Sequence, residues 1–159
     1  MPMALIETID SHRGGLLRAL DKVEALVGAT TTGDELVAAI ETVRHKLLAH
    51  EVTAGRFVVG PLRHLHLLDD RELDALGDER DQLSQEAVRL INGRPDARAV
   101  AAFVLAVRDH VERKARAVAP VARSALAEGR LSPVPRWYVE EVYAEQGDPG
   151  ARPPEEWLG

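Results

Sequence analysis

The sequence predicts an all-α protein, folded as an antiparallel up-down-up-down four-helix bundle with a short C-terminal aromatic-rich helix or tail. Two observations predict this fold. Four segments carry apolar residues at alternating steps of three and four, the pattern of a helix that turns one face toward a core. Short turn-like stretches separate these segments, and helices joined in this way pack as antiparallel neighbours. No segment of useful length alternates like a half-buried strand, so we expect no sheet.

The first two predicted helices flank the stretch GATTTGD, in which Thr32 and Asp34 are suitable caps for the second helix. Pro61 lacks a backbone N–H, so we expect the second helix to bend near it. The inward positions of the first helix are Leu5, Ile9, His12, Leu16, Leu20, Val23 and Val27. Those of the second are Leu36, Ile40, Val43, Leu47, His50, Ala54, Phe57, Pro61 and Leu65.

The third predicted helix follows LLDDRE and ends at NGRPD, where Asn and Gly suit a helix end and Pro95 suits the start of the next helix. Its inward positions are Leu73, Leu76, Arg80, Leu83, Ala87 and Leu90. The inward positions of the fourth predicted helix are Val100, Phe103, Val107, His110, Lys114, Ala117, Val121 and Ala125.

The chain divides into a bundle, residues 1–129, and a tail, residues 130–159, that is rich in Pro and Gly. The tail holds every Trp and Tyr of the protein, namely Trp137, Tyr138, Tyr143 and Trp157. Large amphipathic aromatic side chains are costly to leave in water. We therefore expect the tail to pack on the bundle, or alternatively on a second subunit to form a homodimer.

Composition excludes several classes of function. The apolar fraction is 45% and the charged fraction 29%, and no apolar run reaches the roughly 20 residues that cross a bilayer. The N-terminus does not resemble a secretion signal, so we expect a cytoplasmic protein without a membrane segment. The absence of cysteine excludes disulfides and thiolate metal sites. The net charge of −6, with both signs dispersed, argues against nucleic-acid binding.

Five polar residues interrupt the inward stripes, and they form the candidate site. They are His12, His50, Arg80, His110 and Lys114. A polar group in a core costs roughly 1–3 kcal/mol unless a partner satisfies it, so their presence calls for an explanation. In antiparallel neighbours, residues equally far from the connecting loop lie side by side. We therefore expect all five groups at mid-bundle, with a small ligand in the bundle core.

Over residues 5–128 the sequence resembles the hemerythrin-like (HHE cation-binding) family. The matching segments are IETIDSHRGGLLRAL, LLAHEVTAGRFVVGPL, GDERDQLSQEAVRL and RDHVERKARAVAPVARSAL. In this family helices 2 and 4 each supply a His followed four residues later by a carboxylate, and helices 1 and 3 supply further His. Together these residues hold two irons with room for dioxygen. By this resemblance His12, His50 and His110 match metal-ligand positions.

The remaining ligand positions depart from the family pattern. Ala54 and Lys114 stand where the two carboxylates are expected, and Arg80 stands where the helix 3 His is expected. Two cations therefore point at the volume that metal ions would occupy. Unit charges about 4 Å apart repel by roughly 4 kcal/mol at an effective dielectric of 20, and a divalent ion doubles this. The sequence thus predicts a degenerate site and argues against an ordinary di-iron centre.

Three functions remain open, and the sequence does not decide whether the protein is an enzyme. In the first, His12, His50 and His110 hold a single iron or other divalent metal, or ligate a haem whose propionates pair with Arg80 and Lys114, and the site handles dioxygen, peroxide or nitrogen oxides. In the second, the same groups bind an organic anion.

In the third, the bundle is a metal-free interaction scaffold in which Arg80 and Lys114 replace the metal ions. Burying a charge without a partner is too costly, so this hypothesis predicts salt bridges inside the bundle, with carboxylates such as Glu79 or Glu112.

Overall fold

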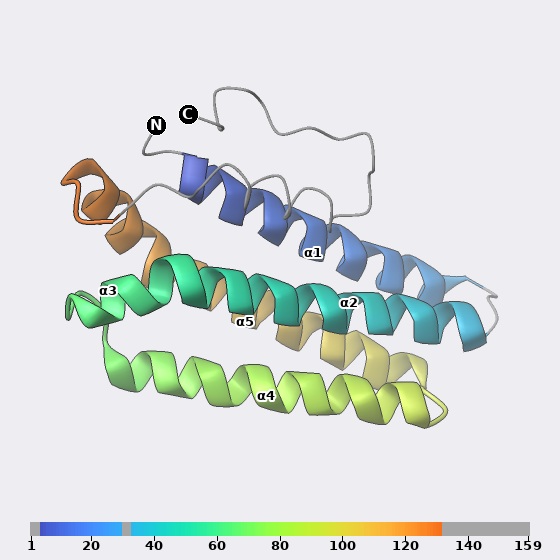
Figure 1. The fold of residues 1–159 in the computed structure, drawn as a ribbon. Helices are drawn as coiled ribbons and strands as arrows, with labels where there is room; N and C mark the ends of the chain where they lie inside the picture. The colour runs from blue at the N-terminus through green and yellow to red at the C-terminus, as the bar shows by residue number, and fades with distance from the viewer. Residues whose placement is uncertain (1–3, 30–32, 132–159) are drawn as a thin grey trace.

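The computed structural model describes residues 4–29 and 33–131, whose regular structure is entirely helical. Four long helices lie alongside one another (Figure 1). They are α1 (Ala4–Gly28), α2 (Gly33–Ala54), α4 (Asp70–Asn92) and α5 (Ala97–Ala127). A π-helical turn, η1 (Gly55–Val59), continues α2 into the short helix α3 (Gly60–His64). The prediction of an all-α fold is confirmed for this part of the chain.

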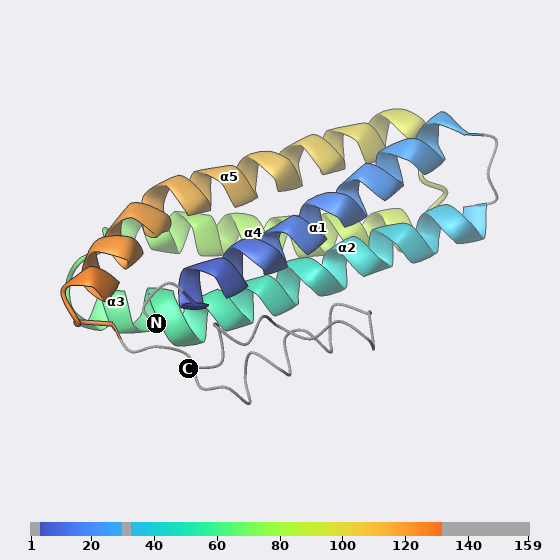
Figure 2. The same ribbon diagram turned by 90° about the horizontal axis from the view of Figure 1, so that it is seen from above.

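The four long helices form a closed ring of neighbours. α1 packs on α2 and α5, and α4 packs on the same two helices from the other side. Figures 1 and 2 show that the end of α1, the start of α2 and the link between α4 and α5 gather at one end of the bundle. The link between α3 and α4 lies at the opposite end. The inward faces of all four helices therefore share one interior.

Polar side chains divide this interior into two apolar clusters. The larger cluster contains Leu16, Leu47 and Val107 and extends toward the link between α4 and α5. The smaller cluster contains Val58 and Val118 and lies toward α3. The residues between them form the polar layer, which consists of the partly exposed Glu79 and five buried residues: His12, His50, Glu51, His110 and Lys114.

Two helix starts are capped by aspartate. Asp69 accepts hydrogen bonds from the backbone N–H groups of Arg71 and Glu72 at the start of α4, and Asp96 accepts one from Ala99 at the start of α5. Each satisfies donors that a helix leaves unpaired in its first turn. At the start of α2, Asp34 lies inside the first turn, where a carboxylate favours the helix dipole. The predicted cap Thr32 lies outside the described residues.

The irregularity expected near Pro61 is the π-helical turn η1. In an α-helix the proline ring would meet the carbonyl four residues earlier, and that carbonyl would lose its donor. The helix widens in the turn that precedes Pro61. There the Gly60 N–H donates a hydrogen bond to the carbonyl of Gly55, five residues earlier. The extra residue in this turn lets the helix continue to His64.

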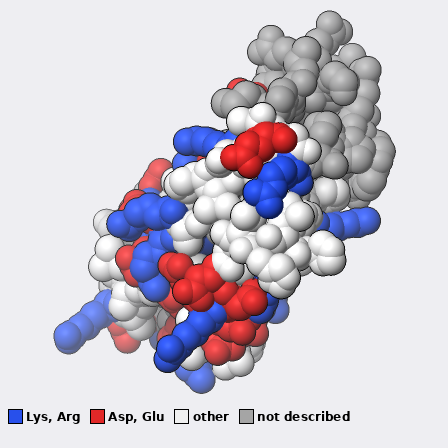
Figure 3. Space-filling model, turned by 90° about the vertical axis from the view of Figure 1, so that its left-hand side faces the viewer, with Lys and Arg blue, Asp and Glu red and all other residues white. Residues whose placement is uncertain are grey.

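Ion pairs tie the helices together at the surface. Arg108 on α5 pairs with Asp21 and Glu24 on α1, and Arg63 on α3 pairs with Asp70 and Asp74 on α4. Such exposed pairs contribute little to stability, because water screens their charges. Lys and Arg side chains are intermixed with Asp and Glu on the face drawn in Figure 3.

Two predictions concern the ends and the surroundings of the bundle. Within the described ranges, no helix combines the length and apolar character needed to span a bilayer. Residues 132–159, which include Trp137, Tyr138, Tyr143 and Trp157, lie outside the described residues. The packing of the tail and the homodimer therefore stay predictions.

Candidate functional site

Glu51 is the centre of the polar layer. Its carboxylate accepts a hydrogen bond from the Lys114 ammonium, with Nζ 2.5 Å from Oε2, and one from His110, with Nε2 3.3 Å from Oε1. His110 is fully buried, and Glu51 and Lys114 are each 8% exposed. One carboxylate on α2 thus joins two basic groups on α5 across the interior.

A second carboxylate extends this network toward the surface. Nδ1 of His110 faces Oε2 of Glu79 on α4 at 3.7 Å, which is too long for a hydrogen bond. The Glu79 carboxylate also accepts a hydrogen bond from Arg113, which in turn pairs with Asp109. His110 therefore lies between two carboxylates, one buried and one partly exposed.

The other two histidines of the polar layer contact each other. The rings of His12 and His50 lie with their centroids 6.1 Å apart, in an edge-to-face arrangement. Nδ1 of His12, His50 and His110 is buried in each case without a hydrogen-bond partner. Each leaves one ring nitrogen able to bind a ligand or a water molecule.

Burial and charge together set the protonation of these groups. Burial alone would raise the pKa of Glu51, but hydrogen bonds from His110 and Lys114 and the charge of Lys114 outweigh it and lower the pKa to about 2. Burial, reinforced by the charge of Lys114, lowers the pKa of His50 to about 3. The pKa of His12 is lowered by burial and by the charge of Lys46. At neutral pH Glu51 is ionised, and His12 and His50 are neutral.

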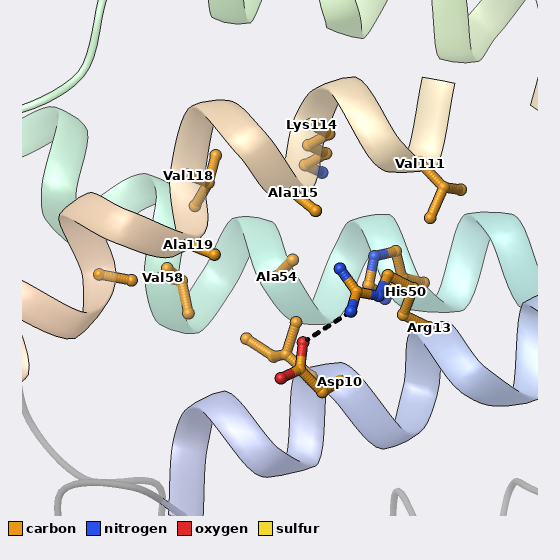
Figure 4. Close-up of a pocket in the computed structure, with 12 residues that line it drawn as sticks. Asp10, Arg13, His50, Ala54, Val58, Val111, Lys114, Ala115, Val118 and Ala119 are labelled. Carbon is orange, nitrogen blue, oxygen red and sulfur yellow. Dashed lines mark ion pairs between the residues drawn. The ribbon is translucent and has the colours of Figure 1, made fainter. Parts of the chain in front are cut away.

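A cavity of about 50 Å³ opens beside His50 and Lys114, between α1, α2 and α5 (Figure 4). Arg13 and Asp10 on α1 lie at one side of it and pair with each other at 3.4 Å. The rest of the lining is apolar: Ile9, Ala54, Val58, Val111, Ala115, Val118, Ala119 and Ala122. The cavity is thus lined by polar groups on one side and by aliphatic side chains on the other.

A larger groove of about 550 Å³ lies between α4 and the continuous stretch of α2, η1 and α3. Glu51 and Lys114 both line the groove, and Lys114 lines the cavity as well. The other charged residues of the groove are Arg63, Asp74, Asp78, Arg80 and Asp81. Carboxylates outnumber cations in the groove, whereas in the cavity Arg13 and Lys114 outnumber Asp10.

The residues present do not fit a di-iron centre. Among the described residues, no three His, Asp or Glu side chains are grouped so that they could hold a metal ion. The buried carboxylate that could bridge two metals, Glu51, is neutralised by the Lys114 ammonium. The unpaired Nδ1 atoms of the three histidines favour a metal, but His12 and His50 share one ring contact, whereas His110 bonds to Glu51.

The structure brings four of the five sequence-predicted site residues into the polar layer, namely His12, His50, His110 and Lys114. Arg80 lies on the inward stripe of α4, but its guanidinium, one-third exposed, turns outward and pairs with Asp81. A long side chain can keep its stem near the core while its charge reaches water. The predicted partners of Lys114 also differ, since Glu79 pairs with Arg113 and Glu112 with Arg116.

The sequence prediction missed Glu51. It considered carboxylates one helical turn after His50, because those positions share the face of His50. Glu51 follows His50 directly and so lies about 100° around the helix. At this level α2 buries both neighbours, together with Thr53 and Ala54. An acidic residue directly after an inward histidine, opposite an inward lysine, was the signal that could have found it.

Comparisons with known proteins gave no relative for this chain: no family model, no curated protein and no solved structure matches it.

Proposed function

We propose that this chain is a hemerythrin-like, up-down-up-down bundle in which a buried ion pair has replaced the metals, and that it binds a small organic anion beside Lys114. The observation that carries the proposal is the contact between the Lys114 ammonium and the Glu51 carboxylate in the middle of the bundle. It neutralises the buried carboxylate without a metal. It also leaves two of the three ammonium protons available to a ligand.

In this proposal the anion binds in the cavity between α1, α2 and α5, because positively charged side chains and an unpaired histidine nitrogen both line it. The charges of Lys114 and Arg13 both act on His50. His50 lines the cavity, and its Nδ1 has no partner. An anion placed here gains charge-assisted hydrogen bonds. The groove between α2 and α4 is less suitable, because its excess of carboxylates repels an anion.

A second candidate is a single metal or a haem held through the histidines, with chemistry on dioxygen, peroxide or nitrogen oxides. The unpaired Nδ1 atoms of His12, His50 and His110 favour it. The Lys114 ammonium opposes it, because a cation beside a metal ion adds repulsion. A haem also needs more room than the cavity of about 50 Å³, since pockets for large ligands measure about 300–1,000 Å³.

Thermal unfolding of the purified protein tests the proposal. Small carboxylates at fixed ionic strength should raise the melting temperature, whereas ferrous iron and zinc should not. The double variant Glu51→Leu with Lys114→Met removes the cation together with its partner, and it should lose the response to carboxylates. Elemental analysis and an optical spectrum of protein purified without chelators distinguish the proposed anion site from the second candidate, a metal or haem site. Stoichiometric iron or a haem absorbance band would overturn the proposal in its favour.

A further inference from the structure

We infer that the ligand of the cavity is a short-chain aliphatic monocarboxylate, with its carboxylate between Lys114 and His50 and its tail along the apolar wall. This inference rests on the function proposed above and narrows the ligand class. It follows from three properties of the cavity: the hydrogen-bond donors on its polar side, the apolar character of its opposite side and its volume.

The polar side offers donors for one carboxylate. Lys114 gives Glu51 a hydrogen bond and keeps further N–H groups. His50 is 5% exposed, and its unpaired Nδ1 can donate to a ligand oxygen in one tautomer. Arg13 adds positive charge, while the carboxylate of Asp10 is held by Arg13 and by Arg123 at 3.7 Å. A single negative charge matches this balance better than a phosphate or a dicarboxylate does.

The opposite side offers no partner for a second polar group. Ala54 on α2 and Val58 on η1 face Val118 and Ala119 on α5 across the cavity (Figure 4). A hydroxyl or a second carboxylate placed here would lose its water without gaining a hydrogen bond, at a cost. Methyl and methylene groups gain from leaving water at the same place. The wall therefore selects a plain aliphatic tail.

The size of the cavity limits the length of the tail. A group the size of a water molecule needs about 10–15 Å³ of cavity volume. The cavity of about 50 Å³ therefore holds roughly four such groups. Acetate has four groups of this size and propionate five, counting carbons and oxygens, so acids with two or three carbons fit this volume. In a longer acid the additional methylenes remain in water and contribute nothing to affinity.

Titration calorimetry with acetate, propionate, octanoate and inorganic phosphate tests this inference on the full chain. Each buried methylene should tighten binding about fourfold, so propionate should bind about fourfold more tightly than acetate. Octanoate should bind no more tightly than propionate, and phosphate should not compete. Equal affinity for acetate and propionate, with binding still lost in the Glu51→Leu, Lys114→Met double variant, would overturn the ligand class and leave the proposed function standing.

A variant pair on α5 checks where the tail lies. Ala119→Leu fills the aliphatic side and should weaken propionate about fourfold while acetate changes little. Ala117→Leu is the matched control, because Ala117 is also partly buried on α5 but lines the space between α4 and α5 instead. Equal effects of the two substitutions on propionate would overturn the assignment of the cavity. Binding of no anion at all would overturn the proposed function itself.

Discussion

The ammonium of Lys114 lies 2.5 Å from the carboxylate of Glu51, and this contact joins α5 to α2 in the middle of the bundle. Both side chains are almost completely withdrawn from water. Removing two charges from water costs several kcal/mol each, and their attraction repays this only when both partners are present. Loss of one partner alone should therefore destabilise the bundle.

Removing one partner of this pair should be far more damaging than removing both. Glu51→Gln leaves the Lys114 charge buried without a counterion, and we expect the free energy of unfolding to fall by roughly 3–5 kcal/mol. The double variant Glu51→Leu with Lys114→Met replaces the pair by apolar groups and should be near neutral. Urea unfolding of the wild type and the variants measures this. A double variant no more stable than Glu51→Gln would contradict the coupling.

As the pH decreases, the free energy of unfolding should fall first because of His50. Its pKa is lowered from 6.5 to about 3 in the folded protein, so below pH 6.5 the unfolded chain binds a proton that the folded protein refuses. The unfolding free energy should then fall by up to about 1.4 kcal/mol per pH unit as the pH decreases from 6.5 toward 3. Unfolding curves across this range should show a shallower slope for His50→Gln. An unchanged slope would remove His50 as the cause.

At lower pH, protonation of Glu51 should reduce the free energy of unfolding further. Its pKa is lowered from 4.5 to about 2, so its contribution is complete above pH 4.5 and disappears as the pH falls toward 2. At most about 3 kcal/mol depends on this shift. Unfolding of the Glu51→Leu, Lys114→Met double variant, measured between pH 5 and pH 2, should lack this component. The same acid dependence in both proteins would show that other carboxylates cause it.

The two glycines of the π-helical turn should respond differently to alanine. A Cβ on Gly60 would lie 2.8 Å from the Gly55 carbonyl oxygen, so the backbone would have to shift. We expect Gly60→Ala to destabilise the protein by about 1–2 kcal/mol. A Cβ on Gly55 meets nothing within 4 Å, and Gly55→Ala should be neutral or stabilising by up to about 1 kcal/mol. Thermal unfolding of the two variants provides the comparison, and similar melting temperatures would argue against the close approach.

The end of α3 should be improved by a glycine. His66 is exposed and has a left-handed backbone with φ of 57°, which costs a non-glycine residue about 1 kcal/mol or more. We expect His66→Gly to raise the unfolding free energy by about 0.5–1 kcal/mol. Gly129 ends α5 with φ of 70°, and Gly129→Ala is the reciprocal control that should lower it. Denaturant titration measures both, and a loss of stability in His66→Gly would indicate a contact through the imidazole.

The fold was predictable from sequence because burial repeats with the helical period. On α4 the stripe Leu73, Leu76, Leu83, Ala87 and Leu90 is buried as its spacing predicts. The same spacing placed His110 and Lys114 in the interior, and both are buried. A period identifies the face of a helix on which a residue lies, and for these residues the face decides the environment.

The partners inside the site were less predictable. The Arg80 backbone follows the inward stripe, but the side chain is long enough to reach Asp81 at the surface. Glu51 lies beside the stripe, and its burial depends on how closely α5 approaches α2 at that level. Neither the reach of a flexible side chain nor the local approach of two helices is encoded in a repeat of three and four residues.

The polar layer between the two apolar clusters also restricts how the helices can align along the bundle axis. Aliphatic stripes can slide past one another by a turn with little loss, because one leucine replaces another in the same space. Such a slip would carry Lys114 away from Glu51 and bury both charges among hydrocarbons. We therefore expect these two residues to select a single axial register. An entirely apolar replacement of the layer would fold as stably, but with competing registers and a less uniquely ordered interior.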